Sequence, residues 1–477
     1  MLKDLRKQLD EKKISAKELT DSYYDQIGKL NDTVKSYLTL CPELAEQQAE
    51  KAQKRIDEKN ASPLTGIPVS IKDNICTKGI KTTCASKMLE DFVPVYNAFA
   101  ADQLDRDGAV FLGKTNMDEF AMGGSGQTSY FGGSRNPYDL SCVTGGSSSG
   151  AAASVAAGLC AAAIGSDTGG SVRQPAAFCG VTGLKPTYGT VSRYGLIAFA
   201  SSLDQIGVLA KSAEDCGIVL NTIAGADEND ATSSRKIHTD YTEKIGSSLT
   251  GLKIGLPKEF FGDGIDPEVR DSVMAAAEFY RAAGCELVEV SMPSLPYAVS
   301  AYYLLSSAEA ASNLSRFDGI KYGHRAEYGE DFNDLISRSR SEGFGMEVKR
   351  RIMLGNYALS SGYYDAYYKN ALKIRQKIKD EYQEIFSRCD LILTPTAPTA
   401  AYKIGAQEED PVKMYLADIC TVPVNIAGLP AISTTCAYTN AGLPIGMSLV
   451  GKAFDEATIL MAADRFERDF KRQEAAL

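Results

Sequence analysis

The order of apolar and helical stretches along the sequence predicts an α/β fold with a largely covered sheet. The expected elements are, in order, strand 66–71, helix 97–108, strand 109–113 and, later, strand 252–257, helix 267–284 and strand 286–290. Strands that alternate with helices build sheets whose faces are covered, and covered strands are continuously apolar. GIPVSI and AVFLG, the first two predicted strands, have this character.

The first 60 residues are expected to be mostly helical. Ser15 and Glu18 form a capping-box pattern, S-x-x-E, ahead of a periodic stretch. A second helix fits 42–59, with a proline in its first turn. We therefore divide the chain into an N-terminal helical extension, residues 1–60, and one larger unit, residues 61–477.

A mostly helical segment rich in tyrosine, residues 298–388, is predicted within the larger unit. Its stretch 363–386 has no internal glycine or proline, so a long helix is expected there, followed by a strand at 391–395. No internal repeat, low-complexity tract or linker divides this part of the sequence. The larger unit is therefore expected to fold as one domain.

Composition excludes several classes of protein. The formal net charge is -10, whereas a protein that grips nucleic acid by itself needs clustered Lys and Arg. The 11 cysteines show neither a CxxC pair nor a zinc spacing, which is typical of reduced thiols in the cytoplasm. The N-terminus has no apolar signal segment, and the apolar stretch 151–164 is too short to span a bilayer. We expect a cytoplasmic protein that does not enter a membrane.

Glycine and serine are concentrated in residues 123–189, which hold 15 of the 42 glycines. Such a stretch can be a flexible linker. Here the helix and strand predicted at 151–164 interrupt it, so a site built from backbone amides, which glycine lets approach a ligand closely, is the better interpretation. GGSSSG also lacks the GxxxxGK[ST] pattern of a phosphate-binding loop.

Histidine, the usual base in serine catalysis, is scarce. The chain has two histidines, and the surroundings of His238 and His324 are typical of surface positions or helix ends. A Ser-His-Asp triad is therefore a poor explanation of the serine-rich region. A nucleophilic serine in this chain needs another base.

Three segments resemble the amidase signature family: IPVSIKDN, GGSSSG and SDTGGSVRQPAAFCG. The resemblance assigns a Ser-cisSer-Lys triad to Lys72, Ser147 and Ser171, with a cis peptide bond before Ser147. It also implies one domain with a central mixed sheet that helices cover on both faces, so residues 61–477 become the catalytic domain. The sequence departs from the family at Ser149, where a glycine is usual.

The triad makes physical sense because burial disfavours the charged form of a lysine and lowers its pKa. A neutral Lys72 could then take a proton from Ser147, which takes one from Ser171. Donors for the developing oxyanion are expected from the backbone N–H groups of Thr168, Gly169 and Gly170, together with that of Ser171. No metal site is expected.

Further segments, 113–125, 128–137 and 416–431, resemble the glutamine-hydrolysing subunits of tRNA-dependent amidotransferases. The resemblance implies that ammonia from glutamine passes to a partner that amidates glutamyl-tRNA, within a complex with two partner subunits, B and C. Contact with tRNA would be mainly through the partner. No cofactor is expected in this chain, and ATP and Mg²⁺ are expected on the partner.

The same resemblance implies a pocket for free glutamine, whose α-carboxylate and α-ammonium need one cation and one anion. Arg351 matches the position for the carboxylate, Asp418 the one for the ammonium, and Tyr302 is a further substrate residue. KRR on a helix is, however, also typical of a solvated basic face. Two other functions remain open: a stand-alone amidase for a small or aryl amide, and a catalytically silent scaffold.

Overall fold

A computed structural model describes residues 1–236, 240–406, 411–475 and 477. The strands are β1 (Tyr37–Leu40), β2 (Pro68–Lys72), β3 (Val110–Thr115), β4 (Ala162–Asp167), β5 (Thr182–Lys185), β6 (Gln205–Ala210), β7 (Lys253–Pro257), β8 (Glu286–Val290), β9 (Leu391–Pro395), β10 (Ala431–Tyr438) and β11 (Pro444–Gly451). The helices are α1 (Leu2–Asp10), α2 (Ala16–Val34), α3 (Pro42–Asp57), α4 (Phe99–Asp107), α5 (Ser149–Ala156), α6 (Arg173–Phe178), α7 (Ala213–Ile223), α8 (Pro267–Ala282), α9 (Leu295–Asn313), α10 (Phe332–Gly343), α11 (Met346–Leu359), α12 (Tyr368–Arg388), α13 (Pro411–Leu416), α14 (Val422–Ala427) and α15 (Glu456–Asp469).

The described strands form one mixed, 11-stranded sheet in the order β1-β3-β2-β4-β6-β5-β10-β11-β9-β7-β8. β2 runs parallel to β3 and β4, and β7 runs parallel to β8 and β9. The strands between these two parallel groups pair antiparallel, from β4–β6 through to β11–β9. The α/β fold with a mixed central sheet is therefore confirmed.

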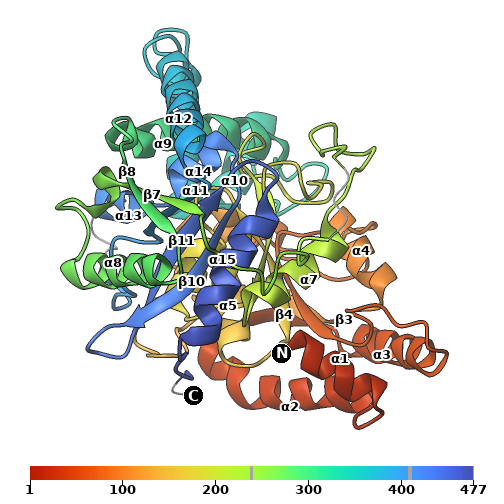
Figure 1. Ribbon diagram of the computed structural model, residues 1–477. Helices are drawn as coiled ribbons and strands as arrows, with labels where there is room; N and C mark the ends of the chain where they lie inside the picture. The colour runs from red at the N-terminus through yellow and green to blue at the C-terminus, as the bar shows by residue number, and fades with distance from the viewer. Residues whose placement is uncertain (237–239, 407–410, 476) are drawn as a thin grey trace.

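Helices cover both faces of the sheet, as expected (Figure 1). Ile164 and Val208 belong to a large hydrophobic core that includes residues of α7 and α15. Their sequence neighbours Ala163 and Leu209 belong to a second core with residues of α5 and α6. Because successive side chains of a strand point to opposite faces, the two cores lie on opposite sides of the sheet.

The N-terminal region is mostly helical and lies at one end of the molecule (Figure 1). The predicted capping box is present: Ser15 Oγ accepts a hydrogen bond from the Glu18 N–H, and the Glu18 carboxylate accepts one from the Ser15 N–H. The region also contributes an edge strand that the sequence interpretation missed, since β1 pairs antiparallel with β3. The division at residue 60 stays a prediction.

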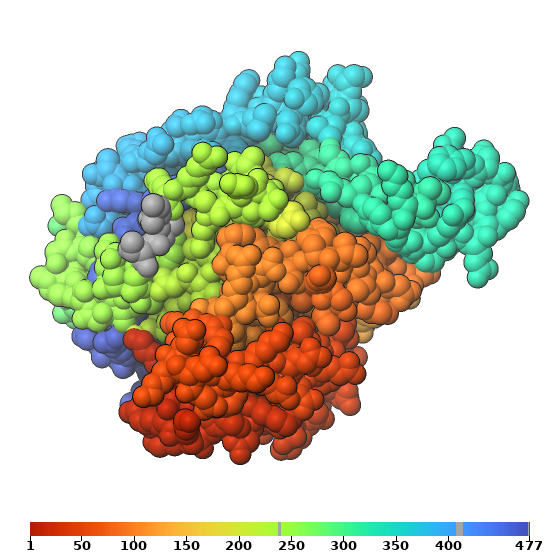
Figure 2. Space-filling model, turned by 90° about the vertical axis from the view of Figure 1, so that its right-hand side faces the viewer, coloured from red at the N-terminus to blue at the C-terminus, as the bar shows by residue number. Residues whose placement is uncertain are grey.

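The segment 298–388 is mostly helical, but the expected long helix starts later than predicted. α12 begins at Tyr368 and not at Tyr363. The Tyr363 ring stacks on Tyr357 of α11, with 4.3 Å between centroids, so the tyrosines close the turn between the two helices. Figure 1 shows α12 projecting from the sheet, and Figure 2 shows the segment around α10 as a lobe at the side of the molecule.

None of the helices among the described residues is both long and apolar enough to cross a bilayer.

Candidate active site

The ends of two parallel strands bring the predicted triad residues to the same edge of the sheet. Lys72 is the last residue of β2, and its neighbour β4 ends at Asp167, four residues before Ser171. Ser147 lies just before α5, and the Ser148 N–H donates a hydrogen bond of 3.0 Å to the Ser171 carbonyl. The peptide bond between Gly146 and Ser147 is cis, as the family resemblance implies.

The Lys72 amine is fully buried among hydroxyl groups. Nζ lies 2.8 Å from Ser147 Oγ, 2.9 Å from Ser148 Oγ and 2.9 Å from Ser166 Oγ. No carboxylate among the described residues lies within ion-pair distance of this amine. The amine is therefore held by neutral partners that can exchange protons with it.

Burial lowers the pKa of Lys72 to about 7, although the more distant carboxylates Asp118 and Asp167 oppose the shift. The Ser148 hydroxyl donates to the Ser166 carbonyl at 3.1 Å, so its oxygen is free to accept from Lys72. A neutral amine that donates to Ser148 and Ser166 keeps its lone pair for Ser147. This is the arrangement that a base for Ser147 requires.

Backbone amides surround the start of the turn that carries Ser171. Among the described residues, the N–H groups of Thr168, Gly169 and Ser171 have no acceptor within the protein. The Gly170 N–H differs, because it donates to Asp167 Oδ1 at 2.9 Å. In this structure three of the four predicted oxyanion donors are therefore free, and the Gly170 donor is occupied.

Glycine is required at two positions of this turn. A Cβ at Gly169 would lie 2.5 Å from the Tyr302 ring, and a Cβ at Gly170 would lie 2.3 Å from Thr421 Oγ1. Gly170 also has φ +136°, which L side chains rarely adopt. The turn thus presents its amides only because no side chains stand between them and their neighbours.

A buried ion pair that the sequence interpretation missed supports the turn. Arg173 Nε and Nη2 each lie 3.0 Å from the Asp167 carboxylate, and both side chains are fully buried. Burial opposes ionisation of Asp167, but the Arg173 guanidinium lowers its pKa below the ordinary value. Asn425 Nδ2 also donates to Asp167, at 2.8 Å. The spacing of an acidic residue six positions before the arginine, SDTGGSVR, was the available signal.

Arg351 does not lie on a solvated face. It is buried at 2% exposure on α11, with its guanidinium carbon 4.4 Å from the centroid of the Tyr303 ring. Arg351 Nε donates to Glu347 Oε1 at 2.6 Å, so the bond to Glu347 does not use the two terminal nitrogens. Those nitrogens form the fork that suits a carboxylate. Its neighbour Arg350 also pairs with Glu347 but is partly exposed.

Asp418 lies on the same aromatic cluster. Tyr303 donates a hydrogen bond of 2.6 Å to Asp418 Oδ2, and the Tyr303 ring stacks on Tyr415 with 4.0 Å between centroids. Burial raises the pKa of Asp418 to about 7, which the bond from Tyr303 opposes. The predicted residue Tyr302 packs against Tyr303, with 5.0 Å between the ring centroids, and its ring also lies against Gly169. Tyr303 is thus a site residue that the sequence interpretation missed, within the visible pair Tyr302-Tyr303.

Thr421 connects the aromatic cluster to the catalytic turn. Its hydroxyl donates to the Gly169 carbonyl at 2.6 Å, and its N–H donates to the Asp418 carbonyl at 3.0 Å. These bonds connect the predicted substrate residues to the turn that carries Ser171 in one network, in which no hydrogen bond of the described residues involves Ser171 Oγ. Ser149, the departure from the family pattern, is buried at the start of α5, with its hydroxyl 3.3 Å from that of Ser134.

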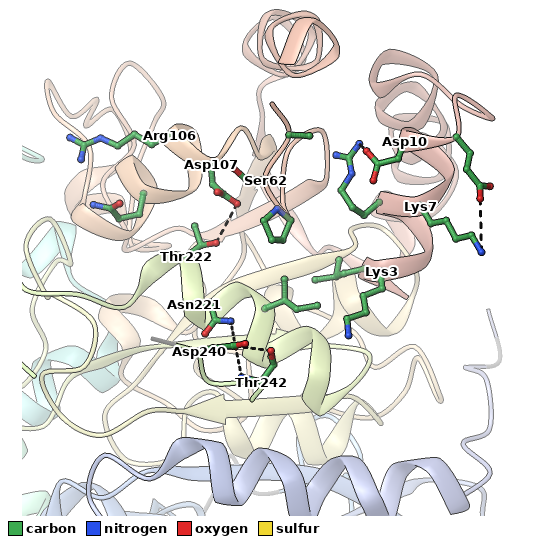
Figure 3. A pocket seen from close by; sticks show the side chains of 17 residues that line it. Lys3, Lys7, Asp10, Ser62, Arg106, Asp107, Asn221, Thr222, Asp240 and Thr242 are labelled. Carbon is green, nitrogen blue, oxygen red and sulfur yellow. Dashed lines mark hydrogen bonds and ion pairs between the residues drawn. The ribbon is translucent and has the colours of Figure 1, made fainter. Parts of the chain in front are cut away.

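A pocket between α1, α4 and α7 lies apart from this network (Figure 3). Several of its polar side chains bind one another: Asp107 accepts from Thr222 at 3.3 Å, and Asp240 accepts from Asn221 and Thr242 at 2.7 Å each. None of the predicted site residues lines it. Its polar groups are therefore not arranged to act on a bound amide.

His324 takes no part in the network. His324 Nε2 lies 2.8 Å from Glu342 Oε2 on the side of the molecule that carries α10, and His238 lies outside the described residues. No group of three or more His, Cys, Asp or Glu residues in the described chain could hold a metal ion. The described chemistry thus centres on serine, lysine and backbone amides.

The fold and this network define an α/β enzyme of the amidase class. The chain belongs to the amidase family, whose sequence model matches residues 18–460. It is 56% identical over 470 residues to the A subunit of glutamyl-tRNA(Gln) amidotransferase from Ruminiclostridium cellulolyticum, covering 98% of this chain and 97% of the relative. It is 54% identical over 468 residues to the protein of the same name in Caldanaerobacter subterraneus, covering 98% and 96%.

A crystal structure of the A subunit of glutamyl-tRNA(Gln) amidotransferase from Thermotoga maritima has the same fold, with a TM-score of 0.81 and 40% sequence identity. The superposition covers 98% of this chain and 96% of the other. The likeness therefore extends over the whole sheet and the helices that carry the network.

Proposed function

We propose that this chain is the glutamine-hydrolysing subunit of a glutamyl-tRNA(Gln) amidotransferase and acts with two partner subunits, B and C. Ammonia released here would pass to the partner that amidates glutamyl-tRNA. The partner would hold ATP, Mg²⁺ and most of the tRNA contact, which agrees with the net charge of -10 on this chain. The 11 cysteines are free and buried, which supports a reducing cytoplasm as the compartment.

The observation that carries the proposal is the buried Lys72 amine at 2.8 Å from Ser147 Oγ. Ser171 Oγ attacks the side-chain amide carbon of glutamine and gives its proton to Ser147 Oγ, while the Ser147 proton moves to Lys72 Nζ. The oxyanion that forms on the amide oxygen accepts hydrogen bonds from free amides of the 168–171 turn.

Collapse of the intermediate needs a proton on the departing nitrogen. Lys72 returns the proton through Ser147 to this nitrogen, and the C–N bond breaks. Ammonia departs, and the γ-glutamyl group remains as an ester on Ser171. Water then attacks the ester and loses its proton through the same relay, which releases glutamate and restores the Ser171 hydroxyl. No oxidant, reductant or metal is required for these steps.

Substrate selection is proposed to follow from the two charged residues. Arg351 would bind the α-carboxylate of glutamine with its terminal nitrogens, and Asp418 would bind the α-ammonium. Tyr302 would close the pocket over the turn, since its ring lies against Gly169. An amidase for apolar or aryl amides would gain nothing from a buried arginine and a buried aspartate.

Glutaminase activity, measured with and without co-expressed partner subunits, tests the proposal. We expect glutamine hydrolysis that requires Ser171 and co-purification of the chain with its partners. A chain that remains alone and hydrolyses a small or aryl amide in preference to glutamine would favour the stand-alone amidase. Full function in Ser171→Ala would instead support the silent scaffold.

A further inference from the structure

Two adjacent buried carboxylates, Asp118 and Glu119, point to different parts of the site. Asp118 binds the serine loop, residues 145–150: its N–H donates to the Ser147 carbonyl at 3.1 Å, and its carboxylate accepts from the amides of Gly126 and Thr128. A Cβ on Gly146 would lie 1.9 Å from Asp118 Oδ2, which shows how closely the carboxylate packs on the loop.

Glu119 binds the start of helix α11 instead. The Gly345 N–H donates to Glu119 Oε2 at 2.9 Å and to Oε1 at 3.1 Å, and the Ser86 hydroxyl donates to Oε1 at 2.5 Å. Ser86 Oγ also lies 3.2 Å from the Gly343 carbonyl oxygen. Gly345 is the N-cap of α11 and has no side chain to cap the helix. Glu119 therefore supplies the cap from a distant part of the chain.

The backbone that directly follows the two carboxylates has an unusual conformation. Phe120 and Ala121 have φ values of +49° and +62°, a conformation that non-glycine residues rarely adopt. The Phe120 ring packs against Phe344, which precedes the helix cap, with 5.5 Å between centroids. Strain of this kind persists only where the surrounding structure fixes the turn, and it clusters at functional sites.

We infer that Glu119 is a positioning residue that seats helix α11 on the serine loop and thereby fixes Arg351 relative to Ser171. A series of contacts connects the Ser147 loop to Arg351. Asp118 bonds to the loop of Ser147, Glu119 bonds to the first residue before α11, and Arg351 lies on the second turn of that helix. A carboxylate is also the side chain favoured at a helix N-terminus, where the backbone amides are unpaired.

The inference rests on the proposed function in one respect, which is that Arg351 binds the substrate carboxylate. Loss of the Glu119 contact should then loosen the grip on glutamine without changing the triad. The expected result is a higher KM for glutamine at nearly constant kcat. A neutral reagent that needs no carboxylate contact should react with Ser171 at the ordinary rate.

Glu119→Gln in the complex with its partner subunits tests this. We expect KM for glutamine to rise about tenfold and kcat to stay within about threefold, because uniform binding is lost and transition-state stabilisation is kept. The rate of inactivation by phenylmethanesulfonyl fluoride, a neutral probe that sulfonylates the Ser171 hydroxyl with loss of fluoride, should be unchanged. The matched control is Asp266→Asn, which makes the same carboxylate-to-amide change at the N-cap of α8, a helix without any site residue.

A second variant approaches the contact from the other side. Gly345→Ala keeps the Glu119 charge, but its Cβ would lie 2.3 Å from Glu119 Oε2 and should separate the pair. It should reproduce the rise in KM, and it decides the matter if Glu119→Gln does not fold. An unchanged KM in the folded variants would overturn the inference, as would an equal fall in kcat and in the inactivation rate.

Arg351→Ala separates this inference from the proposed function. If Arg351→Ala leaves KM for glutamine unchanged, the proposed carboxylate site is wrong. If Arg351→Ala raises KM but Glu119→Gln and Gly345→Ala do not, the site stands and only the positioning role of Glu119 is wrong.

Discussion

Lys72 and Lys114 are both removed from solvent on neighbouring parallel strands, yet their partners differ in kind. Lys72 on β2 meets three serine hydroxyls. Lys114 on β3 donates to the Ile75 carbonyl at 2.6 Å and to Thr82 Oγ1 at 2.7 Å, and its Nζ lies 3.9 Å from the Asp73 carboxylate. Burial lowers the pKa of both amines.

Burial therefore lowers the proton affinity of an amine but does not by itself make that amine a catalytic base. The Lys185 pKa is also lowered to about 7 by burial, although its only hydrogen-bond partner in the described chain is the Pro186 carbonyl. What distinguishes Lys72 is a hydroxyl partner, Ser147, whose neighbour Ser148 donates a backbone hydrogen bond to the carbonyl of Ser171, the proposed nucleophile. The partners, and not the pKa, separate the proposed base from the two structural lysines.

Replacing Lys72 gives the largest expected effect. Lys72→Ala removes the base of the relay, so we expect kcat for glutamine hydrolysis to fall by about 10⁴-fold or more, as for other members of a catalytic unit. The fold should survive, because the lost partners are serines that can rotate their hydroxyls. Steady-state kinetics and a thermal melt check both points. Near-normal turnover would refute the mechanism.

Variants of the two serines that contact Lys72 should distinguish a serine that transfers the proton from one that only orients the amine. Ser147→Ala breaks the path of the proton and should lower kcat by about 10³-fold, within the range for lost proton transfer. Ser148→Ala removes a bond that orients the amine and the bond from Ser148 to the Ser166 carbonyl but leaves the proposed path of the proton intact, so about a tenfold loss is expected because small misplacements reduce the rate. Measurement of kcat for each variant distinguishes the two roles. Equal losses would show that Ser147 merely orients Lys72.

Lys114→Met should affect stability and not chemistry. The change leaves the buried Asp73 without its cation, and breaking a buried ion pair from one side typically destabilises by about 3–5 kcal/mol. Denaturant unfolding measures the loss, and kcat of the folded fraction should remain close to that of the unchanged chain. If kcat fell as far as in Lys72→Ala, the distinction between the two lysines would fail.

Titration of Lys72 predicts the pH dependence. The Lys72 pKa is lowered to about 7, so the amine becomes neutral and active as the pH rises through that value. Asp418, whose pKa is raised to about 7, becomes ionised over the same interval and able to bind the α-ammonium. We expect the logarithm of kcat/KM to rise below about pH 7 with a slope near 2.

Asp418→Asn isolates the lysine in that profile. With one of the two titrating groups removed, the slope of the acid limb should fall to about 1 while KM for glutamine rises. A profile that stays flat from about pH 5.5 to 8 in the unchanged chain would contradict a neutral Lys72 as the base.

Much of the fold followed from local patterns. The alternation around 66–113 and 252–290 gave strands and helices within a few residues, and the Ser15–Glu18 box gave the start of α2. The edge strand β1 was missed because four residues between two helices carry too little periodicity. The helix expected from Tyr363 failed because stacking with Tyr357, a contact across a turn, overrides helix propensity.

Some site residues could be predicted from the sequence and others could not. Lys72, Ser147 and Ser171 lie in motifs that sequence can display, and Asp418 and Arg351 matched by resemblance. Glu119 and Tyr303 could not be assigned, because their roles depend on partners far along the chain: Gly345 for Glu119 and Asp418 for Tyr303. The occupied amide of Gly170 likewise depends on the side-chain position of Asp167.

Lys185→Met is expected to have the smallest effect on kcat, and it extends the comparison of buried lysines to one without a hydroxyl partner. The change leaves one carbonyl, that of Pro186, without a donor, and it removes a cation that the nearby Arg173 repels. Replacing a buried charge by an apolar side chain of similar size is often neutral or stabilising, so kcat should stay within about twofold.

The size of the stability change in Lys185→Met should depend on pH. The folded-state pKa of Lys185 is about 7, below the unfolded value, so between about pH 7 and 10 the unfolded chain binds more protons and the stability of the unchanged chain rises with pH. The variant lacks this contribution. Its advantage should therefore be greatest at or below about pH 7 and shrink by about pH 9, as thermal melts at the two pH values would measure. A constant difference between the two chains would mean that Lys185 keeps its ordinary pKa, and that Lys72 owes its shift to its own surroundings and not to burial in general.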